Sequence, residues 1–376
     1  MVDKSLFFIN FVNQKKKYYL IHNMEYNKEI FGQRLKSARE MRGLSMADLS
    51  QELSGLVTRQ SICKYEAGKM LPDSAVLLRL ARILGVKPDY FFRPFSVALS
   101  GIEFRKKASM SSKACKSVEQ QVLDKVERYF EIEEICGLPH VSSLVSETHP
   151  IHYEDDVKSL VSLIRKEWGL GDDGIIDVIG LLESRGIKVV EIDCPESFDG
   201  LSGMAGNAFV IVINKAFQSE RKRFTALHEL GHLVMQFDET IDNKKKEALC
   251  HLFASEFLIP QNSFMDCIGE LGKNRLNIKH FADIQRAFGI SIDALIRKAY
   301  DAGLISASRY KYYFIQKNKN PQLKEYVERS RAEDEHPERF ESLVYDAYSK
   351  DIISVSKAAS LLNTSVDHIL STAVVM

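Results

Sequence analysis

The pattern of apolar residues divides the chain into a helical first part and a mixed second part. Between residues 28 and 95, apolar side chains recur every three or four positions in short blocks, as at Phe31, Leu35 and Ala38. This period is typical of amphipathic helices. Gly43 and Gly85 each follow such a block and are suited to ending a helix. The pattern therefore predicts a compact unit of four helices and a last short turn.

Three boundary signals place the second, third and fourth helices of this unit. Ser45 is a candidate N-cap, with Asp48 three residues later. The third helix is predicted to begin near Thr58, and Pro72-Asp73 opens the fourth. The second and third helices, joined by a short turn, form the frame of a helix-turn-helix DNA-binding motif. The third helix of the unit would then enter the major groove.

The side chains expected to face DNA lie on that third helix. Arginine and glutamine can make paired contacts with base edges, whereas serine, threonine and lysine suit phosphates. The unit carries 12 Lys+Arg and 7 Asp+Glu, a difference of +5, which favours binding to a phosphate backbone. The alternative is a small helical bundle that binds protein or merely folds. The predicted DNA-binding residues are Thr58, Arg59, Gln60, Ser61 and Lys64.

The pattern becomes mixed from about residue 153. Helices are predicted over 155–168 and 174–185, and strands over 187–192 and 209–213, the second apolar on both faces and therefore central. Further expectations cover a turn over 200–203, helices over 221–237 and 246–259, two helices within 279–304 joined at Gly289, a charged loop over 318–337, and a helical hairpin in the last 35 residues.

The helix predicted over 221–237 carries a metal-binding pattern, His228-Glu229-Leu230-Gly231-His232. Positions i and i+4 share one helix face, so His228 and His232 can bind one metal ion. Glu229 can then act as a general base toward a water molecule that the metal activates. The helix is too apolar for a solvated face, and the competing interpretation is a buried, satisfied histidine pair.

A catalytic zinc site needs a third protein ligand and one open position. The helix predicted over 246–259 offers Glu247, His251 and Glu256. Spacing alone does not choose among them.

The composition adds little about partners and excludes a membrane span. The formal net charge is zero, hydrophobic residues make up 45% and charged residues 27% of the chain, as in ordinary globular proteins. The six cysteines form no CxxC pair, which indicates free thiols in a reducing cytoplasm. No apolar run approaches the roughly 20 residues of a membrane helix. We expect the first 27 residues to be a tail, with Met24 a candidate for the true start.

The helical unit resembles the Cro/phage-repressor-like (XRE) family of helix-turn-helix proteins. The resemblance covers the whole unit and implies binding to a double-stranded DNA operator. A homodimer is a further expectation for this unit. The unit departs from the usual pattern at Ser54-Gly55-Leu56, where the turn is slightly longer. The residues that carry the resemblance are 35–45, 47–50, 61–69, 72–73 and 80–86.

The second part resembles the ImmA/IrrE family of metallopeptidases over about residues 155–300. The family is gluzincin-like, which implies that Glu247 is the third zinc ligand and that Glu256 lies on the helix surface. Cys250-His251 stands where the family often has alanine-asparagine, which leaves His251 as a rival or accessory ligand. The residues that carry this resemblance are 223–233, Glu247, Cys250, Phe253-Ala254 and Leu258-Ile259-Pro260.

These observations predict a cytoplasmic, multi-domain regulator. Its fold would be an all-α helix-turn-helix domain, an α+β zincin-like domain and a small helical C-terminal region. His228, His232 and Glu247 would hold Zn²⁺. Glu229 would act as the general base, and the site would cleave a repressor-type protein. The alternative is a non-proteolytic regulator or antitoxin that uses zinc for sensing or stability. The predicted segments are a tail (1–27), the DNA-binding domain (28–95), a connector with an amphipathic helix (96–152), the peptidase domain (153–305) and the C-terminal region (306–376).

Overall fold

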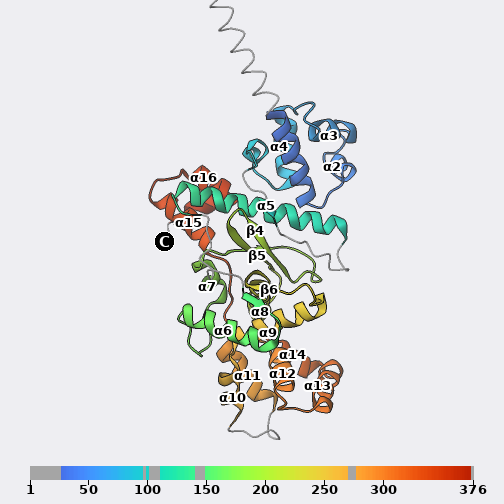
Figure 1. Cartoon of the computed structure of the whole chain (residues 1–376). Coiled ribbons are helices and arrows are strands. Elements are labelled where there is room, and N and C mark those ends of the chain that lie inside the picture. Colours follow the sequence, from blue (N-terminus) through green and yellow to red (C-terminus); the bar gives the residue numbers. More distant parts are fainter. Residues whose placement is uncertain (1–26, 96–98, 101–110, 140–148, 270–276, 374–376) are drawn as a thin grey trace, which may run out of the picture. The chain divides into compact units, whose positions relative to one another are not determined.

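The structure, a computed structural model, describes residues 27–95, 99–100, 111–139, 149–269 and 277–373 (Figure 1). Residues 1–26 of the predicted tail, and residues 96–98, 101–110 and 140–148 of the predicted connector, lie outside this part. No described helix is long and apolar enough to cross a membrane. The chain divides into two compact units, the first comprising Met1–Ala98, Ala108–Leu138 and Glu341–Met376, and the second Leu99–Lys107 and Pro139–Phe340.

The first unit contains the predicted helices, and the predicted caps form. Ser45 accepts a hydrogen bond from the Asp48 amide, while the Asp48 carboxylate accepts one from the Ser45 amide. Gly43 and Gly85 adopt left-handed φ angles of 59° and 68°, which glycine reaches at little cost. The elements are a helix over 27–41, α2 (Met46–Glu52), α3 (Arg59–Glu66), α4 (Ser74–Leu84) and the 3₁₀ helix η1 (Pro88–Phe92).

The predicted amphipathic helix of the connector is α5 (Ser112–Ile135), and it belongs to the first unit. Its apolar side is fully buried at Val122, Val126 and Ile132. A buried ion pair of 2.6 Å joins Arg34 Nη1 to Glu127 Oε2. Packing against the helix-turn-helix elements therefore explains the pattern that the sequence shows.

Three C-terminal helices, α15 (Arg339–Ser349), α16 (Val355–Leu361) and α17 (Val366–Ala373), complete the first unit. The predicted hairpin corresponds to α16 and α17, with α15 before it. Arg128 of α5 donates to the Leu361 carbonyl at 2.7 Å, and Asn363 donates to the Gly85 carbonyl at 3.0 Å. Segments more than 200 residues apart in the sequence, such as Arg128 and Leu361, are thus joined in one unit.

The second unit is built on a sheet of order β1-β4-β5-β3 in the described residues. β5 (Ala208–Asn214) is central, as predicted, and pairs in parallel with β3 (Lys188–Ile192) and antiparallel with β4 (Gly200–Ala205). β1 (Leu99–Ser100) pairs antiparallel with the end of β4. The predicted turn over 200–203 is wrong, because these residues form ladder hydrogen bonds with β5 across their whole length.

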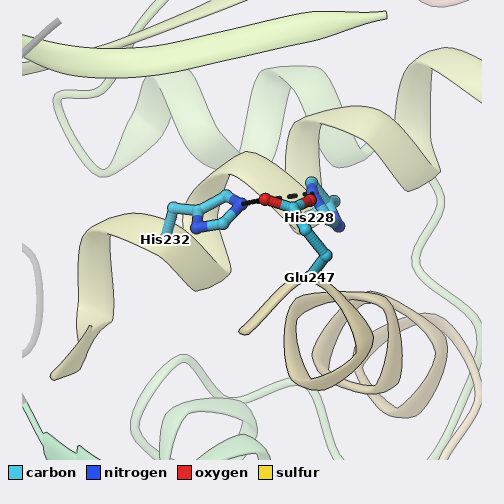
Figure 2. A group of neighbouring side chains, drawn as sticks. All are labelled: His228, His232 and Glu247. Carbon is cyan, nitrogen blue, oxygen red and sulfur yellow. Dashed lines mark hydrogen bonds and ion pairs between the residues drawn. The ribbon is translucent and has the colours of Figure 1, made fainter. Parts of the chain in front are cut away.

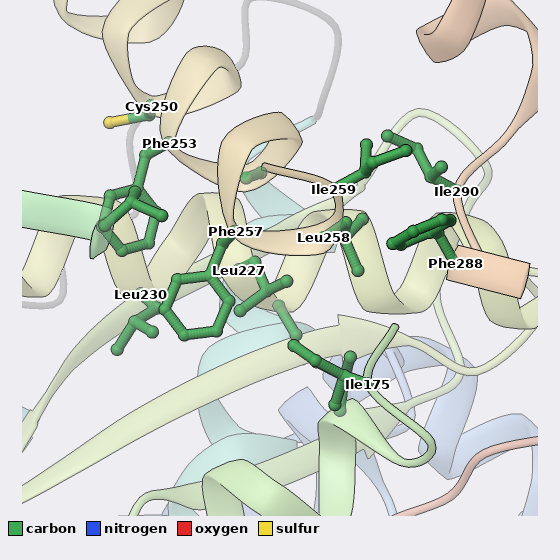
Figure 3. Close-up of a cluster of buried hydrophobic side chains, with 14 of the residues drawn as sticks. Ile175, Leu227, Leu230, Cys250, Phe253, Phe257, Leu258, Ile259, Phe288 and Ile290 are labelled. Atoms are coloured by element: carbon green, nitrogen blue, oxygen red, sulfur yellow. The ribbon is translucent and has the colours of Figure 1, made fainter. Parts of the chain in front are cut away.

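Helices pack in layers against this sheet and form the core of the second unit. α7 (Val178–Ser184) and α8 (Ser219–Val234) contact the sheet, and α9 (Asn243–Leu258) packs against α8 and against α6 (Glu154–Glu167). Figure 3 shows Leu227 and Leu230 of α8 packed against Phe253 and Phe257 of α9. The predicted helix over 221–237 ends three residues early, since residues 235–237 form β6 (Met235–Phe237), which pairs in parallel with β2 (His149–Ile151).

In the described part of this unit five further helices follow α9, and one prediction about this region is wrong. The predicted pair within 279–304 is α11 (Ile278–Phe288) and α12 (Ile292–Asp301), joined at Gly289. The predicted loop over 318–337 is partly helical, because Asn320 caps a helix that begins with Pro321 and buries Val327. The remaining helices are α10 (Gln261–Gly269), α13 (Ala307–Lys319) and α14 (Pro321–Glu328).

Buried carboxylates fix the segment that follows α14. Glu220 of α8 accepts hydrogen bonds from the amides of Arg331 and Ala332 at 2.7 and 3.2 Å. Glu335 pairs with Arg223 of α8 and accepts the first two amides of α7 at 3.0 and 3.2 Å. α8 is therefore held at its N-terminal half by charged contacts and at its C-terminal half by the apolar core.

Candidate metal and nucleic-acid sites

The C-terminal half of α8 lies between β4 and α9, and this position defines the candidate metal site. His228, Glu229 and His232 lie on it in the order that helical spacing dictates. His228 and Glu229 are 9% and 8% exposed, so neither is on a solvated face. α9 runs alongside and presents Glu247 to the two imidazoles (Figure 2).

Three ligand atoms converge at this site. The Nε2 atoms of His228 and His232 are 3.2 Å apart. Glu247 Oε2 is 3.2 Å from His228 Nε2, and Glu247 Oε1 is 3.5 Å from His232 Nε2. Within the described residues this is the one group of three or more His, Cys, Asp or Glu side chains close enough to hold a metal ion.

The donor set fits zinc in type and in spacing. Nitrogen and carboxylate ligands about 2.05 Å from a tetrahedral zinc ion would lie about 3.3 Å from one another. The three separations, 3.2, 3.2 and 3.5 Å, are close to that value. Three protein ligands leave the fourth position open, which is the arrangement of catalytic rather than structural zinc sites.

The electrostatics of Glu247 agree with this arrangement. Hydrogen bonds with His228 and His232 hold the pKa of the Glu247 carboxyl well below its usual range, despite partial burial. The carboxylate is therefore ionised at neutral pH and available as a negatively charged ligand.

The other two side chains considered for the third position are oriented differently. His251 Nδ1 lies 2.6 Å from the Glu247 carbonyl oxygen, which can only accept, so this nitrogen carries the proton. Burial and then the neighbouring His228 lower the pKa of His251. Its ring packs 4.5 Å from that of His228, between centroids, beside the three-residue group rather than within it.

Glu256 lies away from the histidines, in the core of the unit. It is 5% exposed, forms an ion pair with Lys298 of α12 and accepts a hydrogen bond from the Gln261 amide at 3.0 Å. The prediction that Glu256 lies on the helix surface is wrong, because its carboxylate is buried beside Lys298 of α12, which supplies the opposite charge.

Ser202 is a site residue that no pattern in the sequence indicated. Its hydroxyl donates to Glu229 Oε2 at 2.8 Å, from strand β4. β4 approaches α8 closely at Gly200, where a Cβ would lie 2.5 Å from Thr225 Cγ2 and 2.8 Å from the Val212 carbonyl oxygen. Glycine is thus required for the contact that orients Glu229.

The predicted DNA-binding side chains lie together at the start of α3. Arg59, Gln60 and Lys64 are exposed, while Ile62 and Tyr65 on the same helix are buried. The Thr58 hydroxyl lies 3.1 Å from that of the half-buried Ser61 and accepts the Ser61 amide, so Thr58 is the N-cap of α3.

A buried ion pair between Arg39 and Glu66 of α3 fixes the position of α3 in the unit. Arg39 Nε lies 2.6 Å from Glu66 Oε1, and Arg39 also donates to the Leu44 carbonyl at 2.8 Å. The Ser54-Gly55-Leu56 turn before α3 is made by two left-handed residues, Ser54 with φ 55° and Gly55 with φ 74°. These contacts present the polar face of α3 outward.

Comparisons with known proteins match both parts of the chain. Residues 35–91 match the helix-turn-helix family, and residues 182–300 match a peptidase family described as the IrrE N-terminal-like domain. A relative is the SPbeta prophage-derived uncharacterized HTH-type transcriptional regulator YonR of Bacillus subtilis (strain 168), with 41% identity over 64 residues. That match covers 17% of this chain and 57% of YonR. The chain thus carries an XRE-type helix-turn-helix domain followed by an IrrE/ImmA-like peptidase domain.

Proposed function

We propose that this chain is a cytoplasmic DNA-binding regulator whose second unit is a gluzincin-like zinc endopeptidase that cleaves a repressor-type protein. The observation that carries the proposal is the spacing of His228, His232 and Glu247, with the buried Glu229 beside them. The IrrE/ImmA-like domain supports the reaction class. The substrate class follows from the likeness to that family and from the DNA-binding domain on the same chain.

In this proposal His228, His232 and Glu247 hold Zn²⁺, which supplies Lewis acidity that polarises a peptide carbonyl and makes water a stronger acid. Glu229 accepts the proton of the attacking water and later delivers it to the leaving amine. Ser202 donates a hydrogen bond to Oε2 of Glu229 and leaves the other carboxylate oxygen free to accept and donate the proton. Burial of Glu229 limits competition from bulk water.

The test of the proposal is the zinc content of the purified protein and of two variants. We expect about one zinc ion per chain in the wild type, and loss of zinc in His232→Ala and in Glu247→Ala, because each variant removes one of three ligands. Elemental analysis after zinc supply and dialysis gives the stoichiometry. A His251→Ala variant is the matched control and is expected to keep its zinc.

A folded wild type without zinc would overturn the peptidase proposal. Zinc retained in Glu247→Ala but lost in His251→Ala would instead assign the third position to His251.

For the first unit, we propose that Thr58, Arg59, Gln60, Ser61 and Lys64 contact an operator, bound as a homodimer. Replacing Arg59 with alanine is then expected to weaken operator binding by about 1–3 kcal/mol, because a paired contact to a base edge is lost. Fluorescence anisotropy with a duplex selected from a randomised pool measures the change.

Arg82→Ala is the control for charge, since Arg82 is exposed on α4 and outside the proposed contact. It should bind nearly as the wild type does, and both variants should keep their zinc. Unchanged affinity in Arg59→Ala would mean that the recognition residues are misplaced.

A further inference from the structure

α9 presents two side chains to His232, one to each ring nitrogen. Glu247 Oε1 lies 3.5 Å from His232 Nε2, and Cys250 Sγ lies 3.3 Å from His232 Nδ1. The two nitrogens flank Cε1 of the imidazole ring, and their in-plane bonding directions diverge widely. The thiol therefore contacts the nitrogen that does not face Glu247, and it is not one of the three converging residues.

The chemistry of imidazole gives this contact a direction. When Nε2 offers its lone pair to a metal ion, the proton of the neutral ring is on Nδ1. Nδ1–H then donates to Cys250 Sγ, which is a weak acceptor. Partners of this kind fix the tautomer and the ring orientation of metal-binding histidines.

The packing around Cys250 favours a defined position for the sulfur. Cys250 is fully buried, and Figure 3 shows it on α9 next to Phe253. A Cβ at Gly231, the neighbour of His232, would lie 3.3 Å from Phe253 Cδ1, so α8 and α9 are in close contact at this point. The thiol therefore has little freedom to leave His232.

His228 provides the contrast. Its Nδ1 is buried and has no hydrogen-bond partner in the described part of the chain. Of the two histidines, His232 is thus the one whose outer nitrogen has a side-chain partner, and Cys250 is that partner.

We propose that Cys250 is a positioning residue that orients His232 for metal binding, so that α9 supplies both a ligand, Glu247, and the outer partner of another ligand. This inference rests on the proposed zinc site. It assigns to the cysteine a role in metal affinity rather than in the chemistry of hydrolysis.

The experiment compares zinc dissociation constants of the full-length wild type, Cys250→Ala, Cys250→Ser and Cys194→Ala, measured by competition with a chromophoric chelator. Cys250→Ala should bind zinc about 10- to 100-fold more weakly, since outer partners of metal-bound histidines contribute this much. Cys250→Ser keeps a hydrogen-bonding atom and should recover most of the affinity. Cys194→Ala removes a half-buried thiol elsewhere and should bind as the wild type does.

Two further readouts separate orientation from packing. Visible absorption of the Co²⁺-loaded proteins should change in Cys250→Ala and resemble the wild type in Cys250→Ser. Thermal unfolding of the metal-free proteins shows whether lost affinity merely follows lost stability.

Wild-type zinc affinity in Cys250→Ala would overturn the inference. Equal weakening in the alanine and serine variants, in proportion to lost metal-free stability, would also overturn it. A wild type that binds no zinc overturns the proposed function and this inference together, whereas tight wild-type binding with unaffected variants overturns this inference alone.

Discussion

Glu229→Gln is expected to reduce peptide-bond hydrolysis by about 10²- to 10⁴-fold while zinc stays bound, because a positioned general base contributes a factor of this size. Glutamine keeps the shape of the side chain and an oxygen that can accept from the Ser202 hydroxyl, which lies 2.8 Å from Glu229 in the wild type. It cannot take up a proton from water. The loss should therefore appear in the catalytic rate and not in zinc content or in thermal stability.

The measurement uses a peptide library of diverse sequence, incubated with zinc-loaded protein and analysed by mass spectrometry. Glu239→Gln removes the same charge from an exposed position in the turn after β6 and should cleave as the wild type does. Wild-type cleavage by Glu229→Gln would remove Glu229 from the role of base. An uncut library, together with operator binding that requires zinc, would favour the non-proteolytic regulator instead.

Glu256→Ala is expected to destabilise the protein by about 3–5 kcal/mol, because it leaves the Lys298 ammonium buried without its opposite charge. Lys298 and Glu256 are 6% and 5% exposed, and burial already lowers the pKa of Lys298. Urea unfolding of the metal-free protein measures the loss. The folded fraction should still bind zinc, since Glu256 is not among the three converging residues.

Two further variants sharpen this prediction. Asp301→Ala breaks an ion pair in which the Arg297 side chain is 61% exposed and the Asp301 side chain 51% exposed. Exposed ion pairs contribute only about 0–1 kcal/mol to stability. The double variant Glu256→Ala/Lys298→Met removes both buried charges and should recover much of the stability. A Glu256→Ala protein as stable as Asp301→Ala would show that Lys298 is hydrated rather than buried without a partner.

The structure agrees most closely with the predictions from the sequence where the interactions that decide the conformation are local. The Ser45 cap and the left-handed Gly43 and Gly85 depend on a few neighbouring residues, and all form as predicted. The same holds for the relation of His228 to His232, which follows from helical spacing alone. The order of the helices was also predictable from their apolar periods, and the central place of β5 from a run that is apolar on both faces.

The predictions from the sequence were wrong or incomplete where the conformation of a residue depends on partners far away in the chain. Residues 200–203 contain two glycines and suggested a turn, but pairing with β5 and the approach of α8 make them a strand. Ser202 reaches Glu229 only because of that pairing. The attachment of residues 341–373 to the first unit likewise depends on contacts with α5 and η1 that no local pattern records.

The sequence by itself thus determined the helix-turn-helix frame and the His-Glu-x-x-His face, and it limited the third position to three candidate side chains. Only the tertiary structure separated those three: Glu247 faces both histidines, His251 bonds to the carbonyl of its own helix turn, and Glu256 pairs with Lys298. The physical reason is that helical spacing fixes which residues share a face within one helix. The rotation and docking of α9 against α8 and α12 are set by core packing between residues far apart in the chain.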